Sequence, residues 1–133
     1  MNDYTISLNS IILTKSILER PSTKINLSVE NIDINVKSRY EEIENNRLNI
    51  YLTIHLALKN SDTFLISAEM LGVFQYKGNL PFTIEDFSTI NASAIIFPFL
   101  REHIASLTSK AGLNTLLLPP LNFVAMANKN STK

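Results

Sequence analysis

Cysteine is absent from this chain of 133 residues, and glycine occurs at only three positions, Gly72, Gly78 and Gly112. Without cysteine there is no disulfide, no thiol nucleophile and no thiolate metal site, and this composition agrees with a reducing compartment. The glycines are too few to form a phosphate-binding loop or a nucleophile elbow, since both need clustered glycines. Enzyme classes that depend on these devices are therefore excluded.

Net charge is also lacking, because twelve basic residues balance twelve acidic ones. A neutral chain has no overall field that would draw it to nucleic acid or to an anionic membrane surface. No apolar run reaches the length of a transmembrane helix, and the first residues lack the basic and apolar segments of a signal peptide. We therefore expect a cytoplasmic protein with no nucleic-acid partner and no membrane insertion.

Length and composition together predict one folded domain. A chain of 133 residues with an apolar fraction of 45% can bury a core of its own and leaves little room for a second domain. The last residues are polar, which is typical of a loose terminus. We expect a single domain over residues 1–127 and a flexible tail over residues 128–133.

The first part of the chain shows the alternation of β-strands. In residues 47–59, polar or small side chains alternate with a regular apolar series that predicts one long strand: Leu48, Ile50, Leu52, Ile54, Leu56 and Leu58. Residues 4–13, 25–40 and 63–76 also alternate, with a slip near Asn9 that a β-bulge would explain and another slip near Glu30. Polar clusters at residues 44–46 and 60–62 predict tight turns, so four successive strands form an antiparallel sheet.

The period of the apolar residues changes after residue 81. Residues 82–87 predict a crossover segment, and from about residue 91 the spacing becomes helical at Ile96, Leu100, Ile104, Leu107 and Ala111. Asn91 or Ser93 would cap this helix and Gly112 would end it. Pro98 would lie in the first turns, or would kink the helix if the helix began earlier. With a short helix at residues 123–127, the predicted class is α+β, a four-stranded antiparallel sheet followed by a long helix and a short C-terminal helix.

Catalytic and metal-binding residues are not evident. His55 and His103 have no cysteine and no acidic cluster at ligand spacing nearby, so exposed polar residues are a better interpretation than a metal site. The acidic residues 41, 42 and 44 precede a turn and fit the solvated end of a strand better than a pair of catalytic carboxylates. We therefore predict no enzyme activity and no cofactor.

Two segments in the second half of the chain carry a family resemblance. They are Ile96-Phe97-Pro98-Phe99-Leu100-Arg101-Glu102 and Leu118-Pro119-Pro120-Leu121-Asn122-Phe123, with Gly112 between them and Leu71-Gly72-Val73-Phe74 before them. In residues, spacing and order they resemble the SecB protein-export chaperones, whose helix reads approximately Leu-Phe-Pro-Tyr-Ala-Arg-Glu and whose loop reads approximately Leu-Ala-Pro-Val-Asn-Phe. The similarity spans most of the chain and is strongest over residues 64–127.

The resemblance implies an ATP-independent holdase chaperone that binds unfolded or precursor proteins in apolar surface grooves. It also implies a homo-oligomer, commonly a tetramer built as a dimer of dimers. Client contacts are expected in the crossover and the C-terminal loop, at Phe74, Tyr76, Leu80, Phe82, Phe87, Leu113, Leu116, Leu117, Phe123 and Met126. Methionine suits such a surface because it repacks around different partners. Each of these residues could instead belong to the core or to a subunit interface.

The partner that receives the clients is left open. SecB proteins deliver clients to the motor SecA through acidic side chains, and the corresponding contact would involve Glu19 and Leu65 here. The strand acid of that family is replaced by Ser67, an earlier acid is replaced by Ser16, and Arg20 adjoins Glu19. An electrostatic contact with SecA is therefore in doubt. The alternatives are a SecB-like chaperone dedicated to one partner, such as the antitoxin of a toxin–antitoxin system, and an interaction domain that is not a chaperone.

Overall fold

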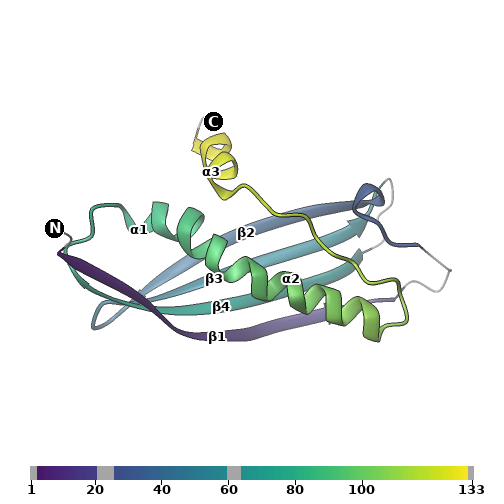
Figure 1. Cartoon of the computed structure of the whole chain (residues 1–133), viewed down its shortest axis with the longest axis horizontal. Coiled ribbons are helices and arrows are strands. Elements are labelled where there is room, and N and C mark those ends of the chain that lie inside the picture. The colour runs from purple at the N-terminus through teal and green to yellow at the C-terminus, as the bar shows by residue number, and fades with distance from the viewer. Residues whose placement is uncertain (1–2, 21–25, 60–63, 132–133) are drawn as a thin grey trace.

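The computed structural model describes residues 3–20, 26–59 and 64–131 (Figure 1). Its strands are β1 (Tyr4–Leu18), β2 (Ile32–Ile43), β3 (Arg47–Leu58) and β4 (Phe64–Gly78). Its helical elements are the 3₁₀ turn η1 (Val29–Asn31), α1 (Ile84–Asp86), the π-helical segment η2 (Phe87–Ala92), α2 (Ser93–Lys110) and α3 (Phe123–Ser131). The α+β class predicted from the sequence is confirmed.

The four strands form one antiparallel sheet in the order β1-β4-β3-β2, so that β1 and β2 are its edges. β2 pairs with β3 without a register shift, and the predicted turn at residues 44–46 joins them. Asn45 and Asn46 both have positive φ angles there, 67° and 60°, which asparagine tolerates better than most residues. The predicted turn at residues 60–62 lies outside the described residues.

One face of the sheet is covered by the continuous helical stretch from α1 to α2, which crosses it diagonally (Figure 1). The apolar face of β3 is fully buried beneath this layer from Leu48 to Leu56, as the alternation predicts, and Leu58 is half-buried. At Gly72 in β4 the helix comes close, since a Cβ there would lie 2.8 Å from Cδ1 of Ile96. Ile96, Leu100 and Ile104 are fully buried against the sheet, which confirms the predicted helical spacing.

Two predicted strand boundaries are corrected by the structure. β1 pairs with β4 as far as Leu18, beyond the predicted end at residue 13, and its register shift between Leu8 and Ser10 lies where a bulge was expected. The slip near Glu30 is the turn η1. The side chain of Asn31 accepts a hydrogen bond from the Ser28 backbone N–H at 3.0 Å, which favours the turn and delays the start of β2 to residue 32.

The helix begins earlier than predicted, since residues 84–110 are helical throughout. Thr83, rather than Asn91 or Ser93, caps it by accepting a hydrogen bond from the Asp86 N–H at 3.0 Å. Pro98 consequently lies inside α2, which is the second of the two arrangements considered for it.

The C-terminal part agrees with the prediction at the end of α2 and differs from it in the length of α3. Gly112, with a φ of 75°, follows the end of α2 as predicted. α3 extends past the predicted residue 127 to Ser131, so residues 128–131 are helical where a loose tail was expected, while residues 132–133 lie outside the described part. The extended chain after Gly112 returns along the helical layer and places α3 near β2 (Figure 1).

Candidate functional site

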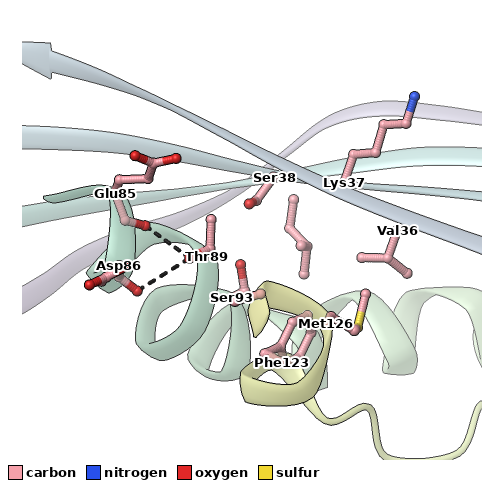
Figure 2. A pocket seen from close by; sticks show the side chains of 11 residues that line it. Val36, Lys37, Ser38, Glu85, Asp86, Thr89, Ser93, Phe123 and Met126 are labelled. Carbon is pink, nitrogen blue, oxygen red and sulfur yellow. Dashed lines mark hydrogen bonds between the residues drawn. The ribbon is translucent and has the colours of Figure 1, made fainter. Parts of the chain in front are cut away.

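A cavity of about 470 Å³ lies where β2, the helical stretch and α3 meet (Figure 2). Its walls come from parts of the chain far apart in sequence. The lining residues are Val36, Lys37 and Ser38 of β2, Leu52 of β3, Glu85 and Asp86 of α1, Thr89 of η2, Ser93 of α2, and Phe123, Met126 and Ala127 of α3. The cavity therefore depends on the docking of α3.

Apolar and polar side chains both line this cavity. Apolar side chains come from the sheet and from α3, and Figure 2 shows Phe123 and Met126 of α3 across from Val36 of β2. The Thr89 hydroxyl donates to the Glu85 backbone carbonyl at 3.0 Å, and the Ser93 hydroxyl is also used within the helix. Because these two hydroxyls already have partners, the polar groups that the helical stretch offers to a ligand are the exposed carboxylates of Glu85 and Asp86.

The predicted residues of the crossover form an aromatic cluster instead of lining this cavity. The rings of Phe82 and Phe87 stack with centroids 5.7 Å apart, and Phe74 meets Phe87 edge-on at 5.4 Å. The ring of Tyr4 from β1 closes the cluster against Phe82 at 5.6 Å. Phe74 and Phe87 are buried, and Phe82, Tyr76 and Leu80 are half-buried. These side chains pack mainly against the protein itself.

The predicted residues of the C-terminal loop divide into two groups. Phe123 and Met126 line the cavity, and Phe123 is held by Phe97 of α2 at a ring distance of 5.8 Å. Leu116 is buried and Leu113 is half-buried, whereas Leu117 is 58% exposed. Of the ten predicted client residues, two thus belong to this cavity. The contributions of β2 were missed because a single strand gives no sign of which helix will pack beside it.

A second cavity of about 380 Å³ lies on the other side of Phe123. It is bounded by Ile90 and Ala94 of the helical stretch and by residues 120–124. Val124, one of its lining residues, is 52% exposed, so this cavity has an open apolar rim.

The opposite face of the sheet carries a polar network around Glu69 of β4. Its carboxylate accepts hydrogen bonds from the hydroxyls of Thr14 at 2.8 Å and Thr53 at 3.0 Å. Arg39 forms an ion pair with it at 3.7 Å and also lies over the Tyr51 ring, 3.7 Å from the ring centre. The acid of this strand is therefore already neutralised within the sheet.

The two residues expected to contact SecA lie in different environments. Glu19 is exposed just after β1, but Leu65 is only 2% exposed. Leu65 belongs to β4, an inner strand of the sheet, and its contact with SecA stays a prediction, as does that of Glu19. Ser67 beside it is buried as well.

The histidines are polar residues of the kind expected. His55 is exposed on β3, and Nε2 of His103 lies 2.8 Å from the Ser16 hydroxyl, which links α2 to β1. Within residues 3–20, 26–59 and 64–131, no three His, Asp or Glu side chains gather closely enough to hold a metal ion. Across the same ranges, no helix is long and apolar enough to cross a bilayer.

The chain is similar in sequence to a known protein family and to several of its members. The family model described as preprotein translocase subunit SecB matches residues 5–133. The protein-export protein SecB of Azoarcus sp. is 29% identical over 126 residues, covering 90% of this chain and 83% of that protein. The protein of the same name from Rickettsia bellii is 28% identical over 138 residues, covering 96% and 89%.

Two solved structures have a similar fold. One is the SecB-like chaperone of Mycobacterium tuberculosis in complex with a peptide from the HigA1 antitoxin, with a TM-score of 0.66, 16% identity and coverage of 88% of each chain. The other is a Streptococcus agalactiae protein of unknown function, with a TM-score of 0.54, 11% identity and coverage of 89% of this chain and 99% of that one. At these identities the likeness concerns the fold.

Proposed function

Because the chain belongs to the SecB family, whose members are chaperones of protein export and not enzymes, we propose that it is an ATP-independent holdase. It binds non-native polypeptides through the cavity beside β2 and the second cavity beside Phe123. The observation that most directly supports this proposal is the cavity of about 470 Å³, whose apolar lining residues come from the sheet and from α3.

The character of these surfaces supports binding that depends little on client sequence. Apolar contact stabilises a complex by about 25 cal/mol for each Å² of apolar surface removed from water, whichever apolar residue supplies the surface. The hydroxyls of Thr89 and Ser93 are paired within their own helix, so an apolar client side chain leaves no buried donor unsatisfied there. Met126 can adjust to side chains of different shape.

We also propose that the protein assembles as a dimer of dimers. β1 is an edge strand, and Ile12, Leu13 and Ile17 along it are each more than two-fifths exposed. Ile95 and Phe99 form a second exposed apolar face on α2. An unpaired edge with apolar side chains and an apolar helix face are both surfaces that a second copy can cover. Two distinct surfaces of this kind are consistent with a tetramer.

The destination of the clients is a second question, and one observation favours a partner other than SecA. Glu69, the one acid described on β4, is engaged by Arg39, Thr14 and Thr53, which leaves little free acidic charge at the centre of the outer sheet face. A chaperone of the same fold binds an antitoxin peptide in M. tuberculosis. The alternative is therefore a chaperone dedicated to an antitoxin. A third candidate function is that of an interaction domain that is not a chaperone.

Suppression of aggregation tests the holdase proposal. Several unrelated unfolded proteins are diluted from denaturant with and without the protein, in the absence of nucleotide, and light scattering is recorded. We expect suppression at a near-stoichiometric ratio for all of them. Met126→Lys places a charge in the cavity and should weaken suppression, whereas Ala125→Lys, exposed on the same helix and outside the cavity lining, should not. Suppression of only one client, or of none, would refute a general holdase.

The identity of the receiving partner calls for a separate experiment. The protein is purified from its native cell under mild conditions and the bound proteins are identified by mass spectrometry. SecA together with many secretory precursors would support export through the motor. A single antitoxin would support the dedicated chaperone.

A further inference from the structure

The chain that returns from α2 to α3 is held in place by side chains and not by a sheet (Figure 1). Among the described residues, no backbone–backbone hydrogen bond reaches residues 114–121. The Thr108 hydroxyl instead accepts a hydrogen bond from the Leu116 N–H at 3.0 Å. Nε of Arg101 donates to the Leu118 carbonyl at 2.5 Å. Two side chains of α2 therefore help to fix the path of this return segment.

Arg101 makes the later of these two contacts, close to the start of α3. Leu118 is followed by Pro119-Pro120, whose rings fix φ and keep this part of the chain extended and stiff. Asn122 then caps α3, because its side-chain oxygen accepts a hydrogen bond from the Ala125 N–H at 3.0 Å. Since the link is short and stiff, a shift of the Leu118 carbonyl would be carried to the first residues of α3.

The first residue of α3 borders both cavities. Phe123 lines each of them, and its ring meets that of Phe97 at 5.8 Å. Phe97 and Arg101 are four residues apart on α2, so they lie on the same side of that helix. The apolar contact at Phe97 is not directional, whereas the hydrogen bond from Arg101 fixes where the return segment lies along α2. Arg101 itself lies outside the lining of both cavities.

We propose that Arg101 is a positioning residue for client binding. By holding the Leu118 carbonyl, it sets where Phe123 lies between the two cavities and hence the shape of the surface that an apolar client side chain meets. Arg101 acts through the N–H at Nε and not through its charge, and it does not touch the client. This inference rests on the proposed client binding and adds the residue that shapes its site.

Two substitutions separate the hydrogen bond from the charge. In Arg101→Gln the amide nitrogen is as many bonds from Cα as Nε is, so the donor stays and the charge is lost. In Arg101→Lys the charge stays, but a methylene group takes the place of Nε. Binding of reduced and carboxymethylated α-lactalbumin, a permanently unfolded protein, is measured by calorimetry.

We expect Arg101→Lys to bind this probe at least about fivefold more weakly than the unaltered protein, and Arg101→Gln to bind it within about twofold. Glu102→Gln, which changes the exposed neighbour of Arg101, is the control and should bind like the unaltered protein. With Pro119→Ala and Pro120→Ala already present, the link is more flexible, so adding Arg101→Lys should change binding by less than about twofold.

Hydrogen exchange gives a measurement that a general loss of stability would not reproduce. Arg101→Lys should speed exchange at the hydrogen-bonded amides of α3 and leave the amides of β3 unchanged. Equal binding of the probe by Arg101→Lys and Arg101→Gln, or tighter binding by Arg101→Lys, would overturn the assignment. If the unaltered protein still binds the probe in that case, the holdase proposal stands without it. If the unaltered protein does not bind the probe, both proposals fail.

Discussion

The close approach of α2 to the sheet at Gly72 leads to a quantitative prediction. A Cβ at this position would lie 2.8 Å from Cδ1 of Ile96, 3.0 Å from its Cγ1, and 2.8 Å from Cε1 of Phe74. All three are atoms of side chains that are themselves fully or almost fully buried, so they have little space into which to move. Gly72→Ala must therefore displace α2 or force Ile96 from its preferred rotamer.

The expected cost follows from two opposing effects. Overpacking a filled core costs about 1–3 kcal/mol, whereas replacing glycine in a strand recovers about 0.5–1 kcal/mol of backbone entropy. We expect Gly72→Ala to lower the free energy of unfolding by about 1–2 kcal/mol. Ile96→Val removes Cδ1, the atom nearest the new methyl group, at a cost of about 0.5–1.5 kcal/mol on its own. The double variant should lose about 1 kcal/mol less than the sum of the two single changes.

Urea denaturation, followed by circular dichroism at one fixed protein concentration, measures these differences. The concentration must be constant because assembly adds to apparent stability. The slope of the unfolding free energy against urea should stay the same in all four proteins, since the exposed surface is similar. A neutral Gly72→Ala, or additive effects in the double variant, would show that α2 does not press on β4 at Gly72.

Three further predictions concern the end of α2 and its exposed face. Thr108→Val should destabilise the fold by about 1–3 kcal/mol in urea denaturation, because the buried hydroxyl accepts a hydrogen bond from the Leu116 N–H at 3.0 Å; Thr108→Ser, which keeps the hydroxyl, should cost less. Gly112→Ala should cost about 1–2 kcal/mol through its φ of 75° alone, since a Cβ there meets nothing within 4 Å, and Gly112→Asn should cost less. Phe99→Ser should shift sedimentation toward smaller species, whereas Glu102→Ser on the same helix should not; an unchanged oligomer would exclude Phe99 from the interface.

Most secondary structure could be predicted from the sequence where the signal is local. The alternation in residues 47–59 became β3, and the helical spacing through Ile96 and Ile104 became α2. The helix start was misplaced because Pro98 suggests a nearby N-terminus, while the true cap, Thr83, lies fifteen residues earlier. A helix tolerates an internal proline when burial of its apolar face against the sheet outweighs the lost hydrogen bond.

The candidate site was only partly predictable. Phe123 and Met126 were found because apolar residues in a loop and short helix near the chain end are unusual. The aromatic residues of the crossover looked equally available, but Phe74 and Phe87 pack against each other and are buried. Whether an apolar side chain faces a ligand or its own core depends on which neighbours reach it, and those neighbours are distant in sequence.

The sequence by itself determined the antiparallel sheet, the long helix, its end at Gly112 and, through two short motifs, the SecB family. These features depend on periodicity, on backbone preferences and on residues close together in the chain. Only the tertiary structure decided that β2 and α3 enclose a cavity, that Leu65 is covered, and that Glu69 is neutralised by Arg39. Arg39 and Glu69 are 30 positions apart in the chain, and Val36 and Phe123 are 87 positions apart. Packing, which periodicity does not encode, brings such residues together.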